Sequence, residues 1–280
     1  MGSLDGRVAI ITGAGRGLGR EHALLFAAEG ARVVVNDLGD AAEAVVEEVR
    51  AAGGEALASN HDITDWDGAG DLVRSAVEAF GRLDVLVNNA GILRDRMLVS
   101  MSEQEWDDVV AVHLKGHFLP TRFAANHWRE RAKAGDEVRA SVVHTSSTSG
   151  LLGNPGQTNY GAAKAGIASF SAICAQELAR YGVRSNCIAP AARTRLTEAT
   201  PGLSDVVAAP AEGFDIWDPG NVSPLVAHLA AADCEITGRT FFVQGGTVRV
   251  MEPWRMGETL ARDERWSIEA LAKALPTILD

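Results

Sequence analysis

Short, almost wholly apolar runs alternate along this chain with longer segments of helical period. The runs at 7–12, 31–36 and 83–87 carry little polar alternation, which is typical of strands covered on both faces, as in a parallel sheet. Further strands are predicted at 55–60, 140–146, 184–189 and 240–244, and helices at 17–29, 41–52, 66–80, 103–131, 155–181 and 220–232. This alternation predicts an α/β fold, a doubly wound parallel sheet of about seven strands with helices on both faces.

The length and the segment pattern indicate one domain with a short extension. A chain of 280 residues fits a single α/β unit, a class that often reaches about 250 residues in one domain. We assign residues 1–246 to that domain and residues 247–280 to a C-terminal extension of it, which we expect to pack on the domain or on a partner subunit. Residues 191–219 hold three prolines and are expected to cover a ligand crevice.

Composition argues against several classes of partner. A net charge of −11 and a pI near 5.1 disfavour nucleic acid and acidic membrane surfaces. No run of 18 apolar residues is present to span a membrane, and the first residues lack the features of a signal peptide. The three cysteines form no CxxC motif, which indicates inert thiols in a reducing compartment. A cytoplasmic protein without a metal site is expected.

A glycine-rich turn, TGAGRGLG, joins the first predicted strand to the first predicted helix. Gly13, Gly17 and Gly19 let backbone amides approach an anion without a Cβ in the way. Arg16 and Leu18 stand between them, and the following helix would direct unsatisfied N–H groups at the same anion. Glycines also end strands for purely structural reasons, but the order of strand, turn and helix is the context that a dinucleotide site requires.

An acidic residue ends the second predicted strand. Asp37 lies 18 residues beyond Gly19, where a carboxylate accepts hydrogen bonds from the adenosine ribose and repels a 2′-phosphate. The alternative is a turn or helix-cap role before the helix at 41–52. Arg16 could attract a 2′-phosphate, but repulsion at close range outweighs a flexible, solvated arginine. The sequence therefore favours NAD over NADP.

Three residues with the chemistry of proton transfer lie between 147 and 164. Tyr160 and Lys164 are four residues apart and so share one helix face, and Ser147 lies at a predicted strand end 13 residues before the tyrosine. A free tyrosine is only ~0.1% ionised at neutral pH, but a nearby ammonium group favours the phenolate. A tyrosine tuned in this way exchanges a proton with an alcohol or ketone oxygen. The YxxxK spacing alone often arises by chance, but its combination with the serine and the glycine turn does not.

The chain resembles the short-chain dehydrogenase/reductase family over about residues 5–246. The matching motifs are TGAGRGLG, NNAG at 88–91, YGAAK at 160–164, IAP at 188–190 and the serine already described. The resemblance implies that Tyr160 is the general acid/base, that Lys164 holds the nicotinamide ribose and lowers the pKa of Tyr160, and that Ser147 hydrogen-bonds the substrate oxygen.

The same resemblance implies a Rossmann-type cofactor site along the strand ends. Its expected cofactor-binding residues, besides the tyrosine and the lysine, are Gly13, Arg16, Gly17, Leu18, Gly19, Asp37, Asp62, Ile63, Asn89, Ala90, Gly91, Pro190 and Thr194. Two positions depart from the family pattern. His113 stands where the family has a proton-relaying asparagine, and a packed structural histidine is as good an interpretation as a relay. Ala191 replaces the glycine that usually follows the proline.

A closer likeness suggests the substrate. The stretches VVVNDLG, NNAGILRDRM and HLKG resemble the hydroxyacyl-CoA dehydrogenase region of peroxisomal multifunctional enzymes and their bacterial relatives. This implies a small-molecule substrate, a 3-hydroxyacyl-CoA or a hydroxysteroid. Candidates to neutralise CoA phosphates are Arg94, Arg96, Arg193 and Arg195, and an apolar wall could include Leu203, Phe214, Trp217 and Trp254. Each of these residues could equally be an ordinary surface or core group.

Two other classes of function stay open at this point. One is a dehydrogenase for a polyol, a sugar or another small alcohol. The other is a non-catalytic NAD(H)-binding sensor on the same fold, which the presence of the serine, the tyrosine and the lysine disfavours. The long helices at 103–131 and 155–181 resemble those through which the family assembles, so a homodimer or homotetramer is expected.

Overall fold

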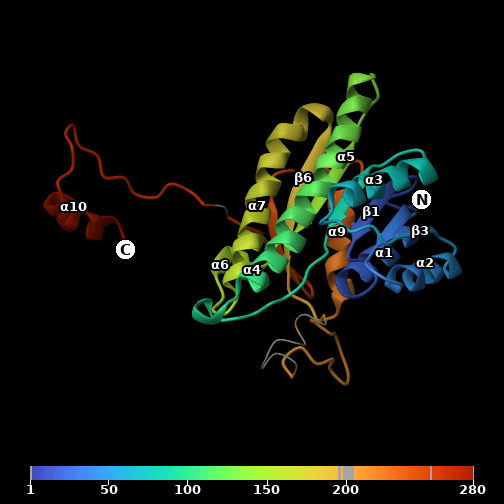
Figure 1. Ribbon diagram of the computed structural model, residues 1–280, viewed down its shortest axis with the longest axis horizontal. Coiled ribbons are helices and arrows are strands. Elements are labelled where there is room, and N and C mark those ends of the chain that lie inside the picture. Colours follow the sequence, from blue (N-terminus) through green and yellow to red (C-terminus); the bar gives the residue numbers. More distant parts are fainter. Residues whose placement is uncertain (1, 195–196, 198–204, 253, 280) are drawn as a thin grey trace.

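The computed structural model describes residues 2–194, 197, 205–252 and 254–279. Strands and helices alternate along it, as the sequence predicts (Figure 1). The strands are β1 (Val8–Thr12), β2 (Arg32–Asn36), β3 (Glu55–Ser59), β4 (Val85–Asn88), β5 (Ala140–Thr145), β6 (Val183–Pro190), β7 (Thr240–Gln244) and β8 (Thr247–Met251). The helices are α1 (Gly17–Ala28), α2 (Ala41–Ala51), α3 (Trp66–Phe80), α4 (Glu103–Val110), α5 (Gly116–Lys133), α6 (Thr148–Leu152), α7 (Thr158–Leu178), α9 (Ser223–Ala230) and α10 (Ile268–Ala274).

The strands form one doubly wound sheet in the order β3-β2-β1-β4-β5-β6-β7-β8. The first seven are parallel, and β8 returns antiparallel to β7 through a two-residue turn at Gly245 and Gly246. The predicted fold class is confirmed, with one strand more than the seven expected. The extra strand escaped prediction because its residues are mostly exposed and carry no buried apolar run. It lies within the segment assigned to the extension.

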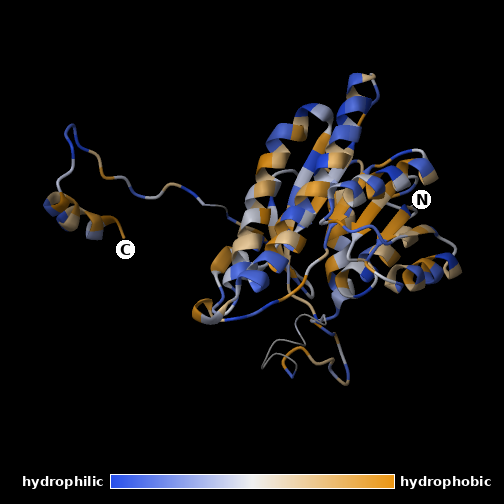
Figure 2. Cartoon of the chain, in the orientation of Figure 1, coloured by the Kyte–Doolittle hydropathy of each residue, from blue (hydrophilic) through white to orange (hydrophobic). Residues whose placement is uncertain are grey.

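Neighbouring apolar residues along each strand point to opposite faces of the sheet, and each face is covered by its own layer of helices. In β1, Val8 and Ile10 pack in a core that includes residues of α3 and α5, whereas Ala9 and Ile11 pack in a second core with α1, α2 and α9. All five residues of β1 are buried. Figure 2 shows the apolar strands inside and the hydrophilic helix faces outside. Burial on both faces therefore explains why the strands read as continuous apolar runs.

The helix predicted at 103–131 is not a single α-helix. A π-helical turn, Ala111–Lys115, separates α4 from α5 and contains His113. Such a turn inserts an extra residue into the helical ladder and often occurs at functional sites. Sequence periodicity of 3.6 residues does not reveal it. The turn contains His113, which lines the active-site cavity.

The C-terminal segment beyond β8 extends away from the domain and ends in α10 (Figure 1). Its large apolar side chains are exposed: Trp254 is 99% and Ile268 is 90% accessible. Packing of this segment on its own domain, one of the two alternatives expected, is therefore not observed. Across the described part of the chain, no helix has both the length and the apolar character needed to cross a bilayer.

Candidate active site

A cavity of about 560 Å³ opens at the carboxyl ends of the parallel strands. It lies where the strand order reverses, between β1 and β4, which is the usual ligand position in a doubly wound sheet. Its walls bring together every predicted site residue except Gly19: Gly13, Arg16, Gly17, Leu18, Asp37, Asp62, Ile63, Asn89, Ala90, Gly91, His113, Ser147, Tyr160, Lys164, Pro190 and Thr194. Residues up to 181 positions apart thus share one site.

The glycine turn has the geometry of a phosphate cradle. Gly13 and Gly17 have positive φ angles of 62° and 53°, which a residue with a Cβ rarely adopts. A Cβ on Gly19 would lie 2.2 Å from the Gly13 carbonyl oxygen, so this glycine lets α1 pack directly under the turn. No side chain caps the N-terminus of α1, so its first N–H groups are free for an anionic ligand. These features fit a dinucleotide pyrophosphate.

Asn89 holds the turn rather than simply lining the cavity. Its amide Nδ2 donates to the carbonyl oxygens of Thr12 and Gly13, both at 3.1 Å. Thr12 in turn accepts the Asn89 and Ala90 backbone N–H groups at 3.0 and 3.2 Å. Sequence reasoning missed Thr12. The available signal was its place as the last residue of β1, directly before the glycines.

Asp37 ends β2 beside the glycine turn. Its Oδ2 accepts the Gly15 N–H at 2.8 Å, and its Oδ1 accepts the Leu38 N–H at 2.9 Å. Asp40, not Asp37, occupies the N-cap position of α2, so the helix-cap alternative does not apply. The carboxylate is partly accessible at the cavity wall, where an adenosine ribose would lie.

Asp62 and Ile63 follow β3 at the same end of the cavity. The Asp62 carboxylate accepts the backbone N–H and the hydroxyl of Thr64 at 2.8 and 2.7 Å, which orders this turn. Ile63 is buried and presents an apolar surface. The exposed Asp62 carboxylate is suited to hydrogen-bond the polar edge of an adenine ring, and the apolar Ile63 side chain is suited to pack on the face of that ring.

Ser147, Tyr160 and Lys164 converge from two elements. Ser147 caps α6 directly after β5, and its side chain hydrogen-bonds Tyr160. Tyr160 and Lys164 lie on one face of α7, with the Lys164 Nζ 5.5 Å from the centre of the tyrosine ring. Lys164 is almost fully buried and donates to the Thr145 carbonyl oxygen at 2.6 Å. The predicted grouping of these residues with the glycine turn in one crevice is therefore what the structure shows.

The expected lowering of the Tyr160 pKa is not observed. Burial raises the pKa of Tyr160 to about 12, and the Ser147 hydrogen bond lowers it by less than burial raises it. Lys164 does not offset this, because burial lowers its own pKa to about 7 and it donates to Thr145. The phenol, a proton donor, is the resting form.

His113 is a fixed part of the cavity wall. Its Nε2 lies 2.7 Å from the carbonyl oxygen and 3.1 Å from the amide nitrogen of Ile92, so it holds the loop after β4. Its ring meets the Tyr160 ring edge-on, with centroids 5.1 Å apart. Burial lowers its pKa well below the usual value, and the charge of Lys164 lowers it further. The imidazole is therefore neutral, and its Nδ1 has no partner among the described residues.

Gly91 and His113 are sterically matched, which makes a testable prediction. A Cβ on Gly91 would lie 2.4 Å from the His113 Cε1, so Gly91→Ala should force the ring from its place. We expect the free energy of unfolding to fall by about 1–3 kcal/mol in urea denaturation. The double variant with His113→Ala should lose less than the sum of the two single variants. Gly246→Ala is the matched control, because nothing lies within 4 Å of its Cβ position; additive losses would show that the two sites are not coupled.

The candidate arginines do not stand free at the cavity. Arg94 pairs with Asp108 at 3.3 Å, Arg96 with Glu105 at 2.8 Å, and Arg193 with Asp215 at 2.5 Å. Arg195 lies outside the described residues. These ion pairs neutralise the three described arginines and connect the segments around the site. Their geometry therefore does not support the idea that they bind CoA phosphates.

The apolar wall is only partly assembled. Trp217 lines the cavity, whereas Phe214 and Trp254 are 63% and 99% exposed. Leu203 lies outside the described residues. A different set of apolar side chains is exposed on the segment after the β4 loop and at the end of α6: Met97, Leu98, Val99 and Leu152, each at least 60% exposed.

Asn159 positions the catalytic helix and was not predicted. Its Oδ1 accepts the Tyr160 N–H at 2.7 Å. Its Nδ2 donates to the carbonyl oxygens of Arg94 and Glu105 at 3.0 and 2.9 Å, which ties the start of α7 to the neighbouring loop and to α4. The one sequence signal was its place directly before the tyrosine.

Comparison with known proteins identifies the class. The family model described as short chain dehydrogenase matches residues 7–204. The chain belongs to the short-chain dehydrogenase family and is an oxidoreductase that acts on CH–OH groups and binds a nicotinamide cofactor.

Individual relatives are similar over most of the chain. Hydroxyacyl-CoA dehydrogenase ChsB1 of Mycobacterium tuberculosis is 47% identical and covers 93% of this chain and 84% of its own length. Peroxisomal multifunctional enzyme type 2 of Drosophila melanogaster is 46% identical over 84% of this chain, which corresponds to 38% of that larger protein. The crystal structure of a short chain dehydrogenase from Mycobacterium avium superposes with a TM-score of 0.91 at 49% identity, covering 99% of this chain and 96% of that one.

Proposed function

We propose that this protein is an NAD-dependent dehydrogenase that oxidises a secondary alcohol to a ketone, reversibly, with a 3-hydroxyacyl-CoA or a hydroxysteroid as substrate. One observation carries the proposal: Ser147, Tyr160 and Lys164 meet in the same cavity as the glycine turn. The hydride acceptor and the proton acceptor would therefore act on one bound alcohol.

The position of each residue in the cavity defines its proposed role. Ser147 and Tyr160 would hold the substrate oxygen by hydrogen bonds, and Tyr160 would exchange the hydroxyl proton. Lys164 would bind the cofactor ribose, and Asn89 would keep the glycine turn in shape. When bound, the oxidised nicotinamide supplies the hydride acceptor and a positive charge. That charge opposes the effect of burial and favours the phenolate of Tyr160.

The preference for NAD rests on Asp37. Its carboxylate lies beside the glycine turn, where the 2′-phosphate of NADP would approach. Like charges at close range oppose binding. Arg16 is exposed at the N-cap of α1, so its charge is screened by water. Together these positions favour the cofactor without the phosphate.

The proposed substrate class is supported by the entrance and by the relatives. Met97, Leu98, Val99 and Leu152 are exposed apolar side chains on the segment before α4 and at the end of α6, and we take them as the apolar rim of the substrate entrance. The segment before α4 and α6 lie at the same end of the domain (Figures 1 and 2). The backbone bridge between Arg96 and Gln157, a cavity residue, connects this segment to the site. An apolar rim suits an acyl chain or a sterol better than a polyol. The similar mycobacterial protein is named a hydroxyacyl-CoA dehydrogenase.

A comparison of three substrates tests the proposal. We expect NADH formation, followed at 340 nm, to be at least about tenfold faster in kcat/KM with a 3-hydroxyacyl-CoA or a 17-hydroxysteroid than with a polyol, because the rim contacts add apolar binding. A polyol or sugar as the best substrate would replace the proposed class. No turnover with any alcohol would favour a non-catalytic NAD(H)-binding sensor.

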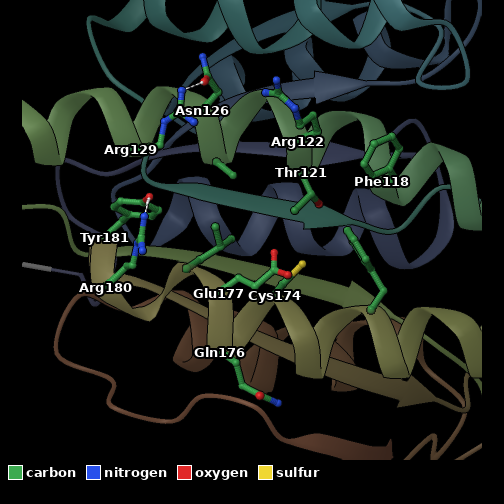
Figure 3. A pocket seen from close by; sticks show the side chains of 13 residues that line it. Phe118, Thr121, Arg122, Asn126, Arg129, Cys174, Gln176, Glu177, Arg180 and Tyr181 are labelled. Atoms are coloured by element: carbon green, nitrogen blue, oxygen red, sulfur yellow. Dashed lines mark hydrogen bonds between the residues drawn. The ribbon is translucent and has the colours of Figure 1, made fainter.

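We also propose that the chain works as a homodimer or homotetramer. A groove of about 600 Å³ runs between α5 and α7 (Figure 3), and exposed apolar residues on these helices include Phe118 and Ile173. The C-terminal segment with α10 leaves its apolar side chains uncovered, which is consistent with packing on a partner subunit. Light scattering of the full chain should give two or four times the mass of 29.6 kDa, and a monomer would refute this.

The proposed location is the cytoplasm. Cys174, Cys187 and Cys234 are free and buried, and burial raises the pKa of Cys174 and Cys187 to about 12. Inert thiols of this kind fit a reducing compartment.

A further inference from the structure

A buried glutamine in the cavity wall has no role in the mechanism above. Gln157 is the N-cap residue of α7, lines the active-site cavity and is only 8% exposed. It precedes Tyr160 by three residues, which is about one helical turn, and Tyr160 lines the same cavity. The Gln157 amide is therefore a polar group on the cavity wall about one turn from the phenol.

Two partners fix the orientation of this amide. The Gln157 Nε2 donates to the Asp95 Oδ2 at 2.8 Å, and the Gln157 Oε1 accepts the Asn154 Nδ2 at 2.9 Å. An ionised carboxylate can only accept hydrogen bonds, so it requires the nitrogen and not the oxygen of the amide on its side. Asp95 therefore determines which way the amide faces.

One N–H of the amide is not used within the protein. A glutamine nitrogen carries two hydrogens, and in the described part of the chain Asp95 is the one group that accepts from the Gln157 Nε2. Asp95 and Asn154 are exposed, whereas Gln157 is buried at the cavity. The second N–H of Gln157 can therefore donate to a ligand in the cavity, and its direction is set in advance by the two partners.

Backbone contacts on both sides of Asp95 hold its carboxylate in this place. The Arg96 N–H donates to the Gly156 carbonyl oxygen at 2.8 Å, and the Asn159 Nδ2 donates to the Arg94 carbonyl oxygen at 3.0 Å. The segment that carries Asp95 is thus attached to the start of α7 before and after the aspartate. Preorganised donors of this kind bind an oxygen atom without a cost of reorganisation.

The position of the donor suits a substrate with two oxygens. Ser147 and Tyr160 would hold the reacting hydroxyl, and groups one helical turn apart are about 5 Å from each other. Two hydrogen bonds over this span can reach two oxygens separated by three carbons. A 3-hydroxyacyl thioester has this arrangement, in its hydroxyl and its carbonyl, whereas a 17-hydroxysteroid has no oxygen at that separation from the hydroxyl.

A polyol also carries oxygens at this separation, but the surroundings of the amide do not suit it. A Cβ on Gly156, the residue before Gln157, would lie 4.0 Å from the Met97 Sδ. The apolar rim therefore begins directly beside the amide. One polar donor next to an apolar side chain fits a carbonyl group on a largely apolar substrate better than a chain of hydroxyls.

We propose that Asp95 orients the Gln157 amide so that its second N–H binds the thioester carbonyl oxygen of a 3-hydroxyacyl substrate. The inference rests on the proposed function and narrows its two substrates to one. Gln157 would contact the substrate directly, and Asp95 would be a positioning residue that acts through Gln157. With its carbonyl held in this way, the substrate presents its hydroxyl to Tyr160 in one orientation.

A pair of substrates tests the inference: 3-hydroxybutyryl-CoA, and its thioether analogue in which CH₂ replaces the carbonyl. Gln157→Met keeps the length of the side chain and removes the N–H. We expect its kcat/KM to fall about 10- to 100-fold with the thioester and to stay within about threefold of the wild-type value with the thioether. Comparison with the wild type on the same substrate cancels the difference in intrinsic reactivity between the two compounds.

Variants of Asp95 test the positioning role. Asp95→Ala should lower kcat/KM with the thioester about 5- to 10-fold, because the amide can then turn, and should leave the thioether unaffected. Asp95→Asn keeps an acceptor oxygen and should retain most of the wild-type rate. Gln104→Met is the matched control: Gln104 donates to the Asp108 carboxylate at 2.6 Å in the same way, but it is exposed on α4 and lies outside the cavity. Its kcat/KM should equal that of the wild type with both compounds.

The outcomes separate this inference from its premise. Equal losses with the thioester and the thioether in Gln157→Met would make the amide a structural group and overturn the inference. A wild-type protein that oxidises both compounds equally well would overturn it without any variant and leave the dehydrogenase activity intact. A wild-type protein that oxidises no alcohol would instead overturn the proposed function.

Discussion

Tyr160→Phe is expected to lower kcat by about 10²-fold or more while the Kd for NAD stays within about twofold of the wild-type value. The change removes only the phenolic oxygen, which hydrogen-bonds Ser147 and would meet the substrate. The ring keeps its edge-on contact with His113, so the cavity wall persists. Steady-state NADH formation with the best substrate measures kcat, and a binding titration measures Kd.

Tyr181→Phe provides a chemically matched control. Tyr181 is the other tyrosine of the chain, lies outside the active-site cavity and contacts Arg180 near the surface. We expect its kcat to equal that of the wild type. If the Tyr160 variant kept full turnover, the assignment of the proton-exchanging residue would be wrong.

Asp37→Ser is expected to reduce the preference for NAD over NADP, measured as the ratio of kcat/KM values, by about 10²-fold or more. The wild-type carboxylate accepts the Gly15 N–H at 2.8 Å and lies against the glycine turn. Serine removes the charge that repels a 2′-phosphate and leaves Arg16 as the nearest charged side chain of the turn. Both effects should raise kcat/KM for NADP, and loss of the carboxylate that would accept the ribose hydroxyls should lower kcat/KM for NAD.

Asp40→Ser separates a local effect from a general change in charge. Asp40 is exposed at the N-cap position of α2, three residues from Asp37, and its side chain makes no cap hydrogen bond. The cofactor ratio of this variant should stay within about twofold of the wild-type ratio. A wild-type enzyme that preferred NADP, or an Asp37 variant with an unchanged ratio, would refute the NAD proposal.

The regular part of the fold was predictable because burial on both faces leaves a visible signal. The runs at 7–12, 31–36 and 83–87 are apolar at almost every position, and each overlaps a strand of the parallel sheet. The exposed strand β8 left no such signal. The π-helical turn at His113 left none either, because one extra residue in a helix changes the direction of a side chain without changing the composition.

Most of the candidate site was also predictable, because the ends of parallel strands meet at one edge of a sheet. The predicted glycines, Asp37, Ser147, Tyr160 and Lys164 required only that rule and the helical spacing of four. Thr12 and Asn159 were missed, since their roles are hydrogen bonds to the backbone of distant residues. The pairing of Arg94, Arg96 and Arg193 with carboxylates could not be inferred, because each partner lies 9 to 22 residues away on another turn or helix.

The sequence by itself determined the class of this protein: the pattern of apolar runs, the glycine turn and the tyrosine–lysine spacing are local properties of the chain. Tertiary structure alone decided the electrostatics. Burial, which depends on every layer around a group, raises the pKa of Tyr160, lowers that of Lys164 and lowers the pKa of His113, so that its imidazole is neutral. The loss of hydration is a property of the packed interior, so no sequence motif records it.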